Sequence, residues 1–422
     1  MYNMEGFISP EEMQTIKQSL ESQSLDSVAE KIQDHANQLN KIVLNIAITG
    51  ESGKGKSTFI NTIRGLGDEE EGSAPTGVVE TTMEPTPYPY PEFPNVKLWD
   101  LPGIGTENFR PDQYLEQVGF QRYDFFIVIS SERFTSYDVQ LAREIQKMGK
   151  HFYFARSKID QSLEGAKRKK NYSEMATLDD IRKDCITGLQ KLGVESPRVF
   201  LISSFDPEKY DFPLLQEEME KDLPQEQRHA FLLALPGITD SIIQRKKAML
   251  QANIWQVALL SGAASAVPVP GVGFAVDLAI LVNELSKYRR AFGLDEASLK
   301  RLADRVNVPV EELKRATKSG LAVEISKEMI INMLMAIPKG KKEETDSRRS
   351  VAAVMFDKVK LSLIGVGVNV LMWSDEFLRF IPVIGTLAAG ATGFTTTYLL
   401  LKLSLNNLAK DAQLVLLRAF EK

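Results

Sequence analysis

The chain has 422 residues, which is too long for one hydrophobic core, so we expect two or three domains. Hydrophobic residues make up 43% of the sequence and charged residues 25%, a balance that excludes fibrous and intrinsically disordered proteins. The net charge of −5 provides no general attraction to nucleic acid, and we expect no nucleic-acid partner. Cys185 is the single cysteine, which excludes an internal disulfide framework and favours a reducing, cytoplasmic location.

Residues 1–40 predict an N-terminal helical segment. Ser9-Pro10-Glu11-Glu12 has the form of a helix start, because Ser9 can accept a backbone N–H and Pro10 suits the first helical position. The alternation of polar and apolar residues then keeps a helical period to about Asn40.

From Ile42 onward, short runs rich in apolar and β-branched residues alternate with helical patterns. This alternation predicts an α/β domain at 41–223, with a mainly parallel sheet covered by helices on both faces. The proline-rich stretch Pro85–Pro94 is expected to be an exposed connection. The predicted strands are 42–49, 96–99, 124–130, 151–155 and 198–203, and the predicted helices between them include 58–66, 139–148 and 178–192.

Strand patterns stop after Pro224, and residues 224–422 predict a helical domain. Asp295 and Pro309 are expected to begin two of its helices, and the charged stretch Pro338–Ser350 is expected to be a surface loop. We therefore expect the α/β domain to be inserted in an all-helical domain that both ends of the chain build together.

A phosphate-binding loop follows the first predicted strand and precedes a predicted helix. Its glycines let backbone N–H groups wrap phosphates, and the helix that follows adds its positive N-terminal dipole. Lys56 is expected to approach the β- and γ-phosphates, and Ser57 offers a hydroxyl ligand to Mg²⁺. The predicted nucleotide-binding residues of this loop are Gly50, Ser52, Gly53, Lys54, Gly55, Lys56, Ser57 and Thr58.

A second motif, Asp100-Leu-Pro-Gly103, stands at the end of the predicted strand 96–99. In this motif Asp100 can hold Mg²⁺ through water, and the Gly103 N–H can contact a γ-phosphate. Such a sequence alone is usually a turn. Its position after the phosphate-binding loop predicts that it belongs to the same site.

The motif Ser157-Lys158-Ile159-Asp160 predicts a guanine site. The Asp160 carboxylate can accept the N1–H and amino group of guanine, whereas adenine would leave a buried carboxylate unpaired. Lys158 can lay its aliphatic stem along the base, and Ser203 and Ser204 are expected to contact the carbonyl of the base. The four motifs follow one another at strand ends, and together they predict GTP or GDP as the ligand.

The group that activates water is less evident, because Ile104 stands where a glutamine would orient the attacking water. That group must come from the segment 76–82 or from a partner molecule. Glu80 is the only acid in the segment and the candidate, although its spacing equally suits a solvated loop carboxylate. The predicted contacts of this segment are Thr76 and Gly77 with the nucleotide and Thr82, or instead Thr81 or Thr76, with Mg²⁺.

Two basic features each have a functional and a structural interpretation. Arg133, just beyond the predicted strand 124–130, could neutralise charge during catalysis or could be an ordinary surface arginine. The run Lys167-Arg-Lys-Lys170 could face an anionic lipid surface or could be simply solvated.

The motifs resemble those of the immunity-related GTPases, an interferon-inducible family with a dynamin-like mode of action. The resemblance covers about residues 10 to 330, and the last ninety residues match less clearly. Lys56 places the chain with members that keep the ordinary lysine of the loop. The matching sequences begin at Gly50 (GESGKGKS), Thr76 (TGVVETTM), Leu98 (LWDLPGIG), Tyr123 (YDFF), Tyr210 (YDFP) and Tyr288 (YRRAFGLDEASL).

This resemblance implies a Ras-like G domain inserted in a helical domain. It also implies that GTP hydrolysis accelerates when two G domains meet nucleotide to nucleotide, so a homodimer or oligomer is expected. In that mechanism the glutamate matching Glu80 takes part in catalysis, and the arginine matching Arg133 lies near the shared interface. The family further implies cell-autonomous defence at the membranes of pathogen-containing vacuoles.

Two long uncharged segments raise the question of membrane contact. Residues 257–276 contain Pro268-Val-Pro-Gly-Val-Gly273, which suits two short helices meeting at a tip, and residues 380–401 also lack charge. Either segment could dip into a membrane or pack inside the helical domain. The expected location is therefore cytoplasmic and partly membrane-associated.

Three functions remain open at this stage. The leading hypothesis is a GTPase that associates through its G domain and remodels or marks a membrane. The second is a nucleotide-gated scaffold with negligible hydrolysis, which Ile104 favours and Glu80 opposes. The third is a protein inserted constitutively in a membrane.

Overall fold

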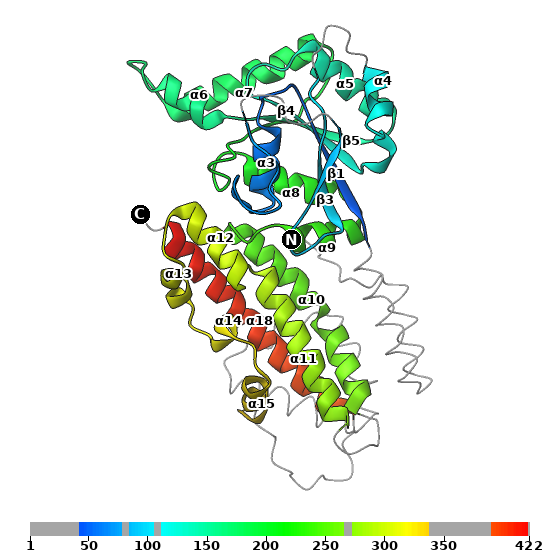
Figure 1. Cartoon of the computed structure of the whole chain (residues 1–422), viewed down its shortest axis with the longest axis vertical. Coiled ribbons are helices and arrows are strands. Elements are labelled where there is room, and N and C mark those ends of the chain that lie inside the picture. The colour runs from blue at the N-terminus through cyan, green and yellow to red at the C-terminus, as the bar shows by residue number, and fades with distance from the viewer. Residues whose placement is uncertain (1–41, 78–83, 105–110, 266–271, 337–389, 421–422) are drawn as a thin grey trace, which may run out of the picture. The chain divides into compact units, whose positions relative to one another are not determined.

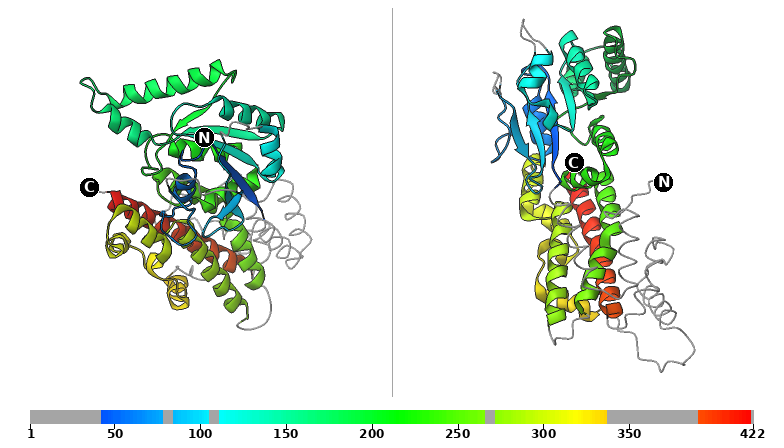
Figure 2. Two further views of the ribbon diagram at one scale, coloured as in Figure 1. Left: turned by 45° about the horizontal axis from the view of Figure 1, so that its top comes forward. Right: turned by 90° about the vertical axis from the view of Figure 1, so that its right-hand side faces the viewer.

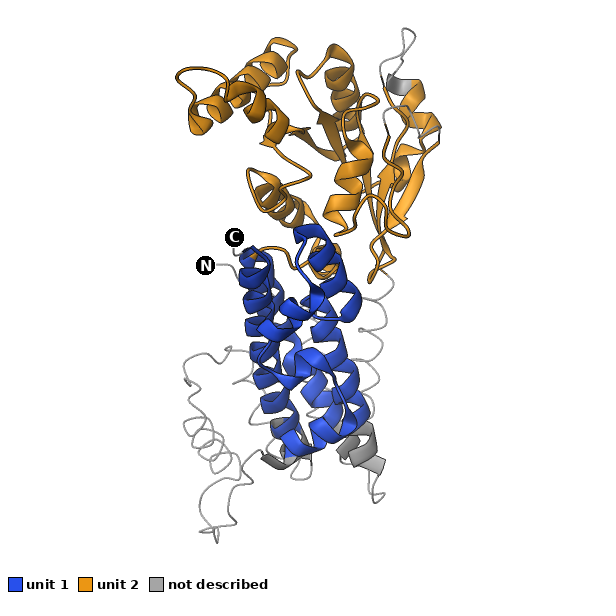
Figure 3. Cartoon of the chain, turned by 60° about the vertical axis from the view of Figure 1, so that its left-hand side comes forward, with its two compact units in different colours: residues 1–39, 240–422 blue, residues 40–239 orange. Residues whose placement is uncertain are grey.

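The computed structural model describes residues 42–77, 84–104, 111–265, 272–336 and 390–420 (Figure 1). The chain divides into two compact units, which Figure 3 colours separately: residues 40–239 form one unit and the rest of the chain forms the other. The predicted N-terminal helical segment 1–40 and the predicted loop 338–350 lie outside the described residues.

The unit 40–239 is built on a sheet whose strands, within the described residues, have the order β2-β3-β1-β4-β5-β6. Every neighbouring pair is parallel except β2 and β3. This mainly parallel sheet confirms the predicted α/β class. The strands are β1 (Leu44–Thr49), β2 (Thr86–Pro89), β3 (Val96–Asp100), β4 (Phe125–Ser130), β5 (His151–Arg156) and β6 (Val199–Leu201).

Helices cover both faces of this sheet, as predicted. On one face, α3 (Lys56–Ile63) and α8 (Phe212–Asp222) meet through the rings of Phe59 and Phe212, whose centroids are 5.5 Å apart. The other face carries α4 (Pro111–Gln117), α5 (Ser136–Lys147), α6 (Ile159–Ala166) and α7 (Glu174–Lys191), and a short 3-10 helix, η1 (Phe120–Arg122), leads into β4. Apolar residues of the sheet and of these four helices form the core there.

The expectation that Pro85–Pro94 is an exposed connection is wrong for its first half. Thr86–Pro89 forms β2, which pairs antiparallel with β3 at the edge of the sheet. Proline lacks the N–H that a central strand must donate, but an edge strand needs only one hydrogen-bonding side. Tyr90, which follows β2, is buried at 1% exposure and belongs to the core.

This compact unit extends beyond residue 223, where the α/β domain is predicted to end. Helix α9 (Gln225–Ala234) contacts β1 and β3, and the Gln227 Nε2 donates to the Asp124 carboxylate at 3.0 Å and to the Val43 carbonyl at 3.2 Å. The unit therefore keeps α9 and ends at Thr239.

The other unit is helical throughout its described residues. Helices α10, α11 and α18 run alongside one another in Figures 1 and 2 and contact each other pairwise. Asp295 caps α12 by accepting the Ser298 N–H at 3.0 Å, and Pro309 precedes α13, so both predicted helix starts are confirmed. The helices are α10 (Asp240–Ser265), α11 (Val272–Ala291), α12 (Glu296–Val306), α13 (Val310–Ala316), α14 (Gly320–Val323), α15 (Lys327–Ala336) and α18 (Gly390–Phe420).

The described parts of the two uncharged segments lie inside this helical unit. Ala258 of α10 and Leu401 of α18 are fully buried, and the hydroxyls of Ser261 and Thr397 join these two helices at 2.7 Å. Residues 266–271 and 380–389 of the same segments lie outside the described residues. No helix in the described ranges has both the length and the apolar composition that crossing a membrane requires.

Candidate functional site

The phosphate-binding loop connects β1 to α3, as its sequence predicts. Gly50 has a φ of 140°, and a Cβ on it would lie 2.1 Å from the Ile129 carbonyl oxygen, so only glycine fits there. Gly53 and Gly55 also have positive φ angles of 75° and 95°. Gly55 is the N-cap residue of α3, so the free N–H groups of the first helical turn lie next to this loop.

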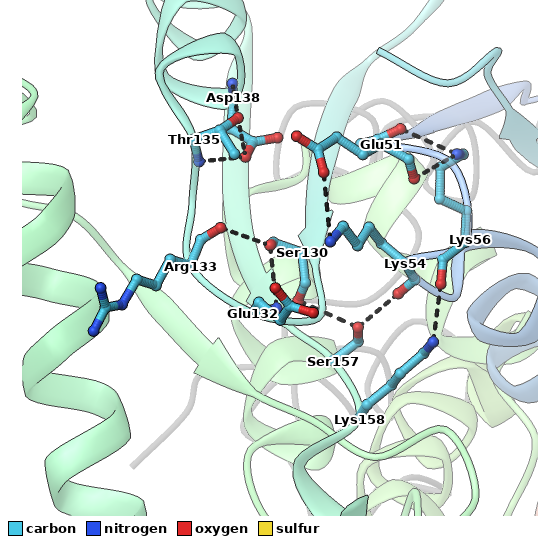
Figure 4. Close-up of polar contacts among 12 residues, drawn as sticks. Glu51, Lys54, Lys56, Ser130, Glu132, Arg133, Thr135, Asp138, Ser157 and Lys158 are labelled. Atoms are coloured by element: carbon cyan, nitrogen blue, oxygen red, sulfur yellow. Dashed lines mark hydrogen bonds and ion pairs between the residues drawn. The ribbon is translucent and has the colours of Figure 1, made fainter. Parts of the chain in front are cut away.

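Backbone carbonyls of the phosphate-binding loop hold the Lys56 side chain in place. Its Nζ donates to the carbonyls of Gly50 at 3.0 Å and Glu51 at 3.2 Å (Figure 4), and the side chain is buried. The ammonium group is thus fixed over the loop, where a phosphate would meet both its charge and the N–H groups of the helix start.

Ser57 and Asp100 come together although they lie 43 residues apart in sequence. The Ser57 hydroxyl donates to the Asp100 Oδ2 at 2.7 Å, and the Asp100 side chain is buried at 1% exposure. A hydroxyl and a carboxylate are hard oxygen donors of the kind that Mg²⁺ prefers. Ser57 and Asp100, two of the predicted metal ligands, therefore form one donor set next to Lys56.

The turn 101–104 that follows Asp100 is bonded to the phosphate-binding loop. The Ile104 N–H donates to the Gly50 carbonyl at 3.3 Å, and the Ile104 side chain is buried at 4% exposure. The buried apolar side chain cannot orient a water molecule, which agrees with the absence of a glutamine at this position. Gly103, the residue before it, is partly exposed in the same turn.

Tyr114 of α4 supports this turn and was not identified from the sequence. Its hydroxyl donates to the Pro102 carbonyl at 2.8 Å and lies 3.2 Å from the Thr49 hydroxyl at the end of β1. Burial raises the pKa of Tyr114 far above its usual range, so the phenol stays neutral and can act as a donor. A lone tyrosine in an amphipathic helix gives no sequence signal for such a contact.

The base motif contacts the phosphate-binding loop directly. The Ser157 hydroxyl donates to the Lys54 carbonyl at 2.7 Å, and the Lys158 Nζ donates to the Gly53 carbonyl at 2.9 Å (Figure 4). Lys158 adopts the left-handed conformation with φ 56°, which turns the chain at the start of α6. Asp160 lies in the first turn of α6 and is partly exposed, so its carboxylate remains accessible to a ligand.

Ser203 and Ser204 stand at the end of β6, next to the base motif. The Ile159 N–H, between Lys158 and Asp160, donates to the Ile202 carbonyl at 3.3 Å. The Ser203 hydroxyl is buried and lies 3.2 Å from the Phe205 N–H, which it accepts. All four predicted motifs therefore meet at the carboxyl edge of the sheet, where ligands of such sheets bind.

Two acidic side chains, Glu51 within the phosphate-binding loop and Asp138 at the start of α5, form an acidic pair (Figure 4). Asp138 closes a capping box with Thr135 at the start of α5, and within the described residues its Oδ1 is buried without a hydrogen-bond partner. Burial, with a smaller contribution from Glu51, raises the pKa of Asp138 to about 6. The Glu51 carboxylate in turn pairs with Lys54 at 3.4 Å. The sequence pattern predicted neither carboxylate.

Arg133 points away from the phosphate-binding loop in Figure 4. Its side chain is 85% exposed, and its Nε lies 3.2 Å from the Asp184 carboxylate of α7. Thr76 and Gly77, in the segment that follows α3, are exposed. Thr58 lies in the first turn of α3. Glu80, Thr81 and Thr82 lie outside the described residues. The roles of all these residues stay predictions.

Comparison with known proteins agrees with this geometry. A sequence model of the family described as interferon-inducible GTPase (IIGP) matches residues 9–354. The chain is 41% identical over 417 residues to interferon-inducible GTPase 5 of Bos taurus, covering 98% of this chain and 83% of the bovine protein. It is 44% identical over 321 residues to interferon-gamma-inducible GTPase 10 of Mus musculus, covering 75% of this chain and 77% of the mouse protein.

A third relative, interferon-inducible GTPase 1 of Mus musculus, is 41% identical over 314 residues, covering 74% of this chain and 76% of that protein. The family match spans both compact units rather than the nucleotide site alone. The resemblance drawn from the motifs is confirmed. The chain belongs to the interferon-inducible GTPase family, and it is a GTP-binding GTPase.

Proposed function

We propose that this chain hydrolyses GTP to GDP with Mg²⁺ bound by Ser57, Asp100 and a threonine of the segment 76–82, for which Thr82 is the candidate. The hydrogen bond between the Ser57 hydroxyl and Asp100 carboxylate carries this proposal, because it assembles two oxygen ligands beside Lys56. Bound Mg²⁺ would neutralise charge on the β- and γ-phosphates. The base motif selects guanine through Asp160.

The chain's own residues divide the work of hydrolysis. Lys56 and the N–H groups at the start of α3 hold the phosphates in place and stabilise negative charge that develops on them. The Gly103 N–H contacts the γ-phosphate from the neighbouring turn. Since Ile104 is buried and apolar, Glu80 is the group that positions the attacking water and accepts its proton.

The second part of the proposal is that two copies complete the site by meeting through their G domains. The solvent exposure of Arg133 at 85% supports this, because a second copy could displace its exposed ion pair with Asp184. A guanidinium supplied across the interface would stabilise charge on the transferred phosphoryl group.

The third part is that the chain acts in cell-autonomous defence, from the cytoplasm and in part at intracellular membranes. Names of its relatives support the link to interferon responses. The run 167–170 supports attraction to anionic lipid, since it lies exposed between α6 and α7, where Lys167 pairs with Glu164 at 2.8 Å. The segments 257–276 and 380–401 remain candidates for hairpin-mediated contact.

The catalytic role is tested by replacing Glu80 with Ala and measuring single-turnover GTP hydrolysis at saturating protein. We expect a loss of 100-fold or more, on the order of the contribution of a positioned general base, with GDP affinity unchanged. Glu84→Ala is the matched control, because Glu84 is an exposed acid just beyond this segment. Unchanged hydrolysis in Glu80→Ala would exclude it as the catalytic group. Negligible hydrolysis by the wild-type chain would favour the nucleotide-gated scaffold.

Membrane contact is tested by co-sedimentation with liposomes that contain or lack anionic lipid, in GTP-analogue and GDP states. Binding that needs anionic lipid, and that falls when Lys169 and Lys170 are replaced by Ala, would support electrostatic contact through 167–170. Retention in the membrane pellet through salt and carbonate washes would instead show constitutive insertion. No binding in either state would contradict this part of the proposal.

A further inference from the structure

The motif Tyr210-Asp211-Phe212-Pro213 has no role in the site as described so far. It ends the loop of residues 203–209, which we call the base loop because Ser203 and Ser204 begin it. Phe212 is fully buried at the first position of α8, and Tyr210 takes the left-handed conformation with φ 54°. The chain thus reverses at Tyr210 and is anchored immediately afterward.

Asp211 closes the base loop onto the last residue of β6. The Asp211 N–H donates to the Leu201 carbonyl at 2.9 Å, and the Leu201 N–H donates to the Asp211 Oδ2 at 2.7 Å. The two residues therefore pair as in a sheet, with a carboxylate oxygen replacing one backbone carbonyl. The span between them is fixed at both ends, although its interior is a loop.

Arg182 of α7 also stabilises this closure of the base loop. One terminal nitrogen of its guanidinium donates to the Asp211 Oδ2 at 2.6 Å and the other donates to the Val199 carbonyl of β6 at 2.9 Å. The Asp211 side chain is 16% exposed and the Arg182 side chain 36% exposed, so the carboxylate end of this charge-assisted bond is the better protected from water. One arginine thus ties the start of β6 to the end of the base loop.

The beginning of the base loop is bonded to the rest of the nucleotide site. Ile202 donates to the Arg156 carbonyl at 2.8 Å and accepts the Ile159 N–H at 3.3 Å, which places Ser203 beside the base motif. The Thr62 hydroxyl of α3 donates to the Ser204 carbonyl at 2.8 Å. These bonds hold the beginning of the loop, and Asp211 holds its far end.

We propose that Asp211 and Arg182 are positioning residues that fix the base loop for contact with the carbonyl oxygen of guanine. The inference rests on guanine binding by this chain and on the predicted contact of Ser203 and Ser204 with that carbonyl. It assigns the two halves of guanine recognition to different groups. Asp160 recognises the N1–H and amino side, whereas the Asp211–Arg182 pair maintains the geometry that recognises the carbonyl side.

Two nucleotide analogues separate these halves. 6-Thio-GDP replaces the carbonyl oxygen with a larger sulfur, which accepts hydrogen bonds weakly. IDP lacks the amino group from which Asp160 accepts a hydrogen bond. The experiment measures dissociation constants of GDP, 6-thio-GDP and IDP for the full chain and for Asp211→Ala, Asp211→Asn and Arg182→Ala. Asp222→Ala is the matched control, because Asp222 forms an equivalent 2.6 Å ion pair with Arg198 in the same unit.

For Asp211→Ala and Arg182→Ala we expect GDP to bind at least tenfold more weakly. The preference for GDP over 6-thio-GDP should shrink toward one, while the preference for GDP over IDP stays at the wild-type value. Asp211→Asn keeps an oxygen acceptor for the Leu201 N–H and should recover part of the preference. The Asp222→Ala chain should keep both preferences.

Wild-type preference for GDP over 6-thio-GDP in Arg182→Ala and Asp211→Ala would overturn the inference. An equal loss of both preferences would also overturn it, because a general loosening of the site moves both ratios. Should Asp211→Ala fail to fold, as judged by thermal unfolding, Arg182→Ala and Asp211→Asn carry the same test. Failure of the wild-type chain to bind GDP would instead overturn guanine binding itself.

Discussion

The two compact units bury polar groups in different ways. In the α/β unit, buried polar side chains at the carboxyl edge of the sheet bond to backbone groups of the phosphate-binding loop, as Lys56 and Ser157 do. In the helical unit they lie along helices and join one helix to another, as the Ser261–Thr397 pair and Lys246 do. The first arrangement shapes loops around a ligand, whereas the second fixes helix register.

This difference predicts how each unit responds to substitution. Removing a polar group at the sheet edge should alter nucleotide binding more than folding, since the loops it holds are peripheral to the core. Removing one between helices should alter folding alone. The following substitutions test this contrast in order of decreasing effect.

Replacing Lys56 with Ala should weaken GTP binding or turnover at least a thousandfold, about 4 kcal/mol, because a fixed charge on the phosphates is lost. Thermal stability without nucleotide should change little. Lys150→Ala is the control, since Lys150 also donates to two backbone carbonyls, at 2.7 and 3.4 Å. Turnover within tenfold of wild type for Lys56→Ala would contradict the assignment of this loop.

In the helical unit, we expect the buried cation of Lys246 in α10 to have a large effect on the pH dependence of stability. Complete burial lowers the pKa of Lys246 to about 7, and its Nζ donates to the Ala291 carbonyl at 2.6 Å. The unfolded chain then binds more protons than the folded chain between pH 7 and the ordinary lysine value, so stability rises with pH in that window.

From about pH 7 to pH 9, the free energy of unfolding of the wild type should rise by about 2 kcal/mol because of this group. Lys246→Met should lose that gain and leave nucleotide affinity unchanged. Lys247→Met, at the neighbouring and partly exposed lysine, should alter the pH dependence less. Equal pH slopes for wild type and Lys246→Met would refute the burial argument.

Asp138 gives the opposite pH dependence at the sheet edge. Since burial raises its pKa to about 6, the folded chain binds more protons than the unfolded chain between about pH 4 and pH 6. Stability should therefore fall as pH rises through that window, by about 2 kcal/mol. Asp138→Asn should remove this decline, whereas Glu174→Gln, at an exposed first-turn acid of α7, should retain it. The check is urea unfolding across pH 4 to 7.

The Ser261–Thr397 pair should contribute the smallest effect. A double-mutant cycle with Ser261→Ala and Thr397→Ala should give a coupling energy of about 1 kcal/mol in unfolding, typical of a buried hydrogen bond. Ser261→Ala combined with Ser404→Ala should show none, since Ser404 is buried in α18 but does not bond to Ser261 in the structure. Coupling in the second cycle would indicate general loosening of the helices.

The nucleotide site could be predicted from sequence because its residues lie in short motifs at strand ends, and a parallel sheet brings such ends to one edge. Lys56, Ser57, Asp100 and Ser157 meet there as expected. The supporting residues could not be predicted in this way. Thr62, Tyr114 and Arg182 act through contacts distant in sequence, and each is an ordinary helix residue.

Two features of the fold also escaped the sequence pattern. Strand β2 was not predicted because it contains alternating prolines. Prolines are acceptable there only because β2 lies at the edge of the sheet, and that position depends on pairing with the neighbouring strand. The predicted α/β domain ends before α9. Helix α9 belongs to the unit through hydrogen bonds of Gln227 with Val43 and Asp124, and these residues are too far apart in the chain for a local pattern to reveal the contact. In both cases long-range packing decides what local composition cannot.

We propose that this GTPase completes its catalytic site with a second copy of the chain. The most direct measurement is GTP turnover per molecule across a hundredfold range of protein concentration, at saturating GTP and Mg²⁺. Turnover per molecule should rise with concentration and reach a plateau, and Arg133→Ala should flatten the rise while leaving GDP affinity unchanged. A turnover per molecule that stays constant across the whole range would contradict catalysis between two copies.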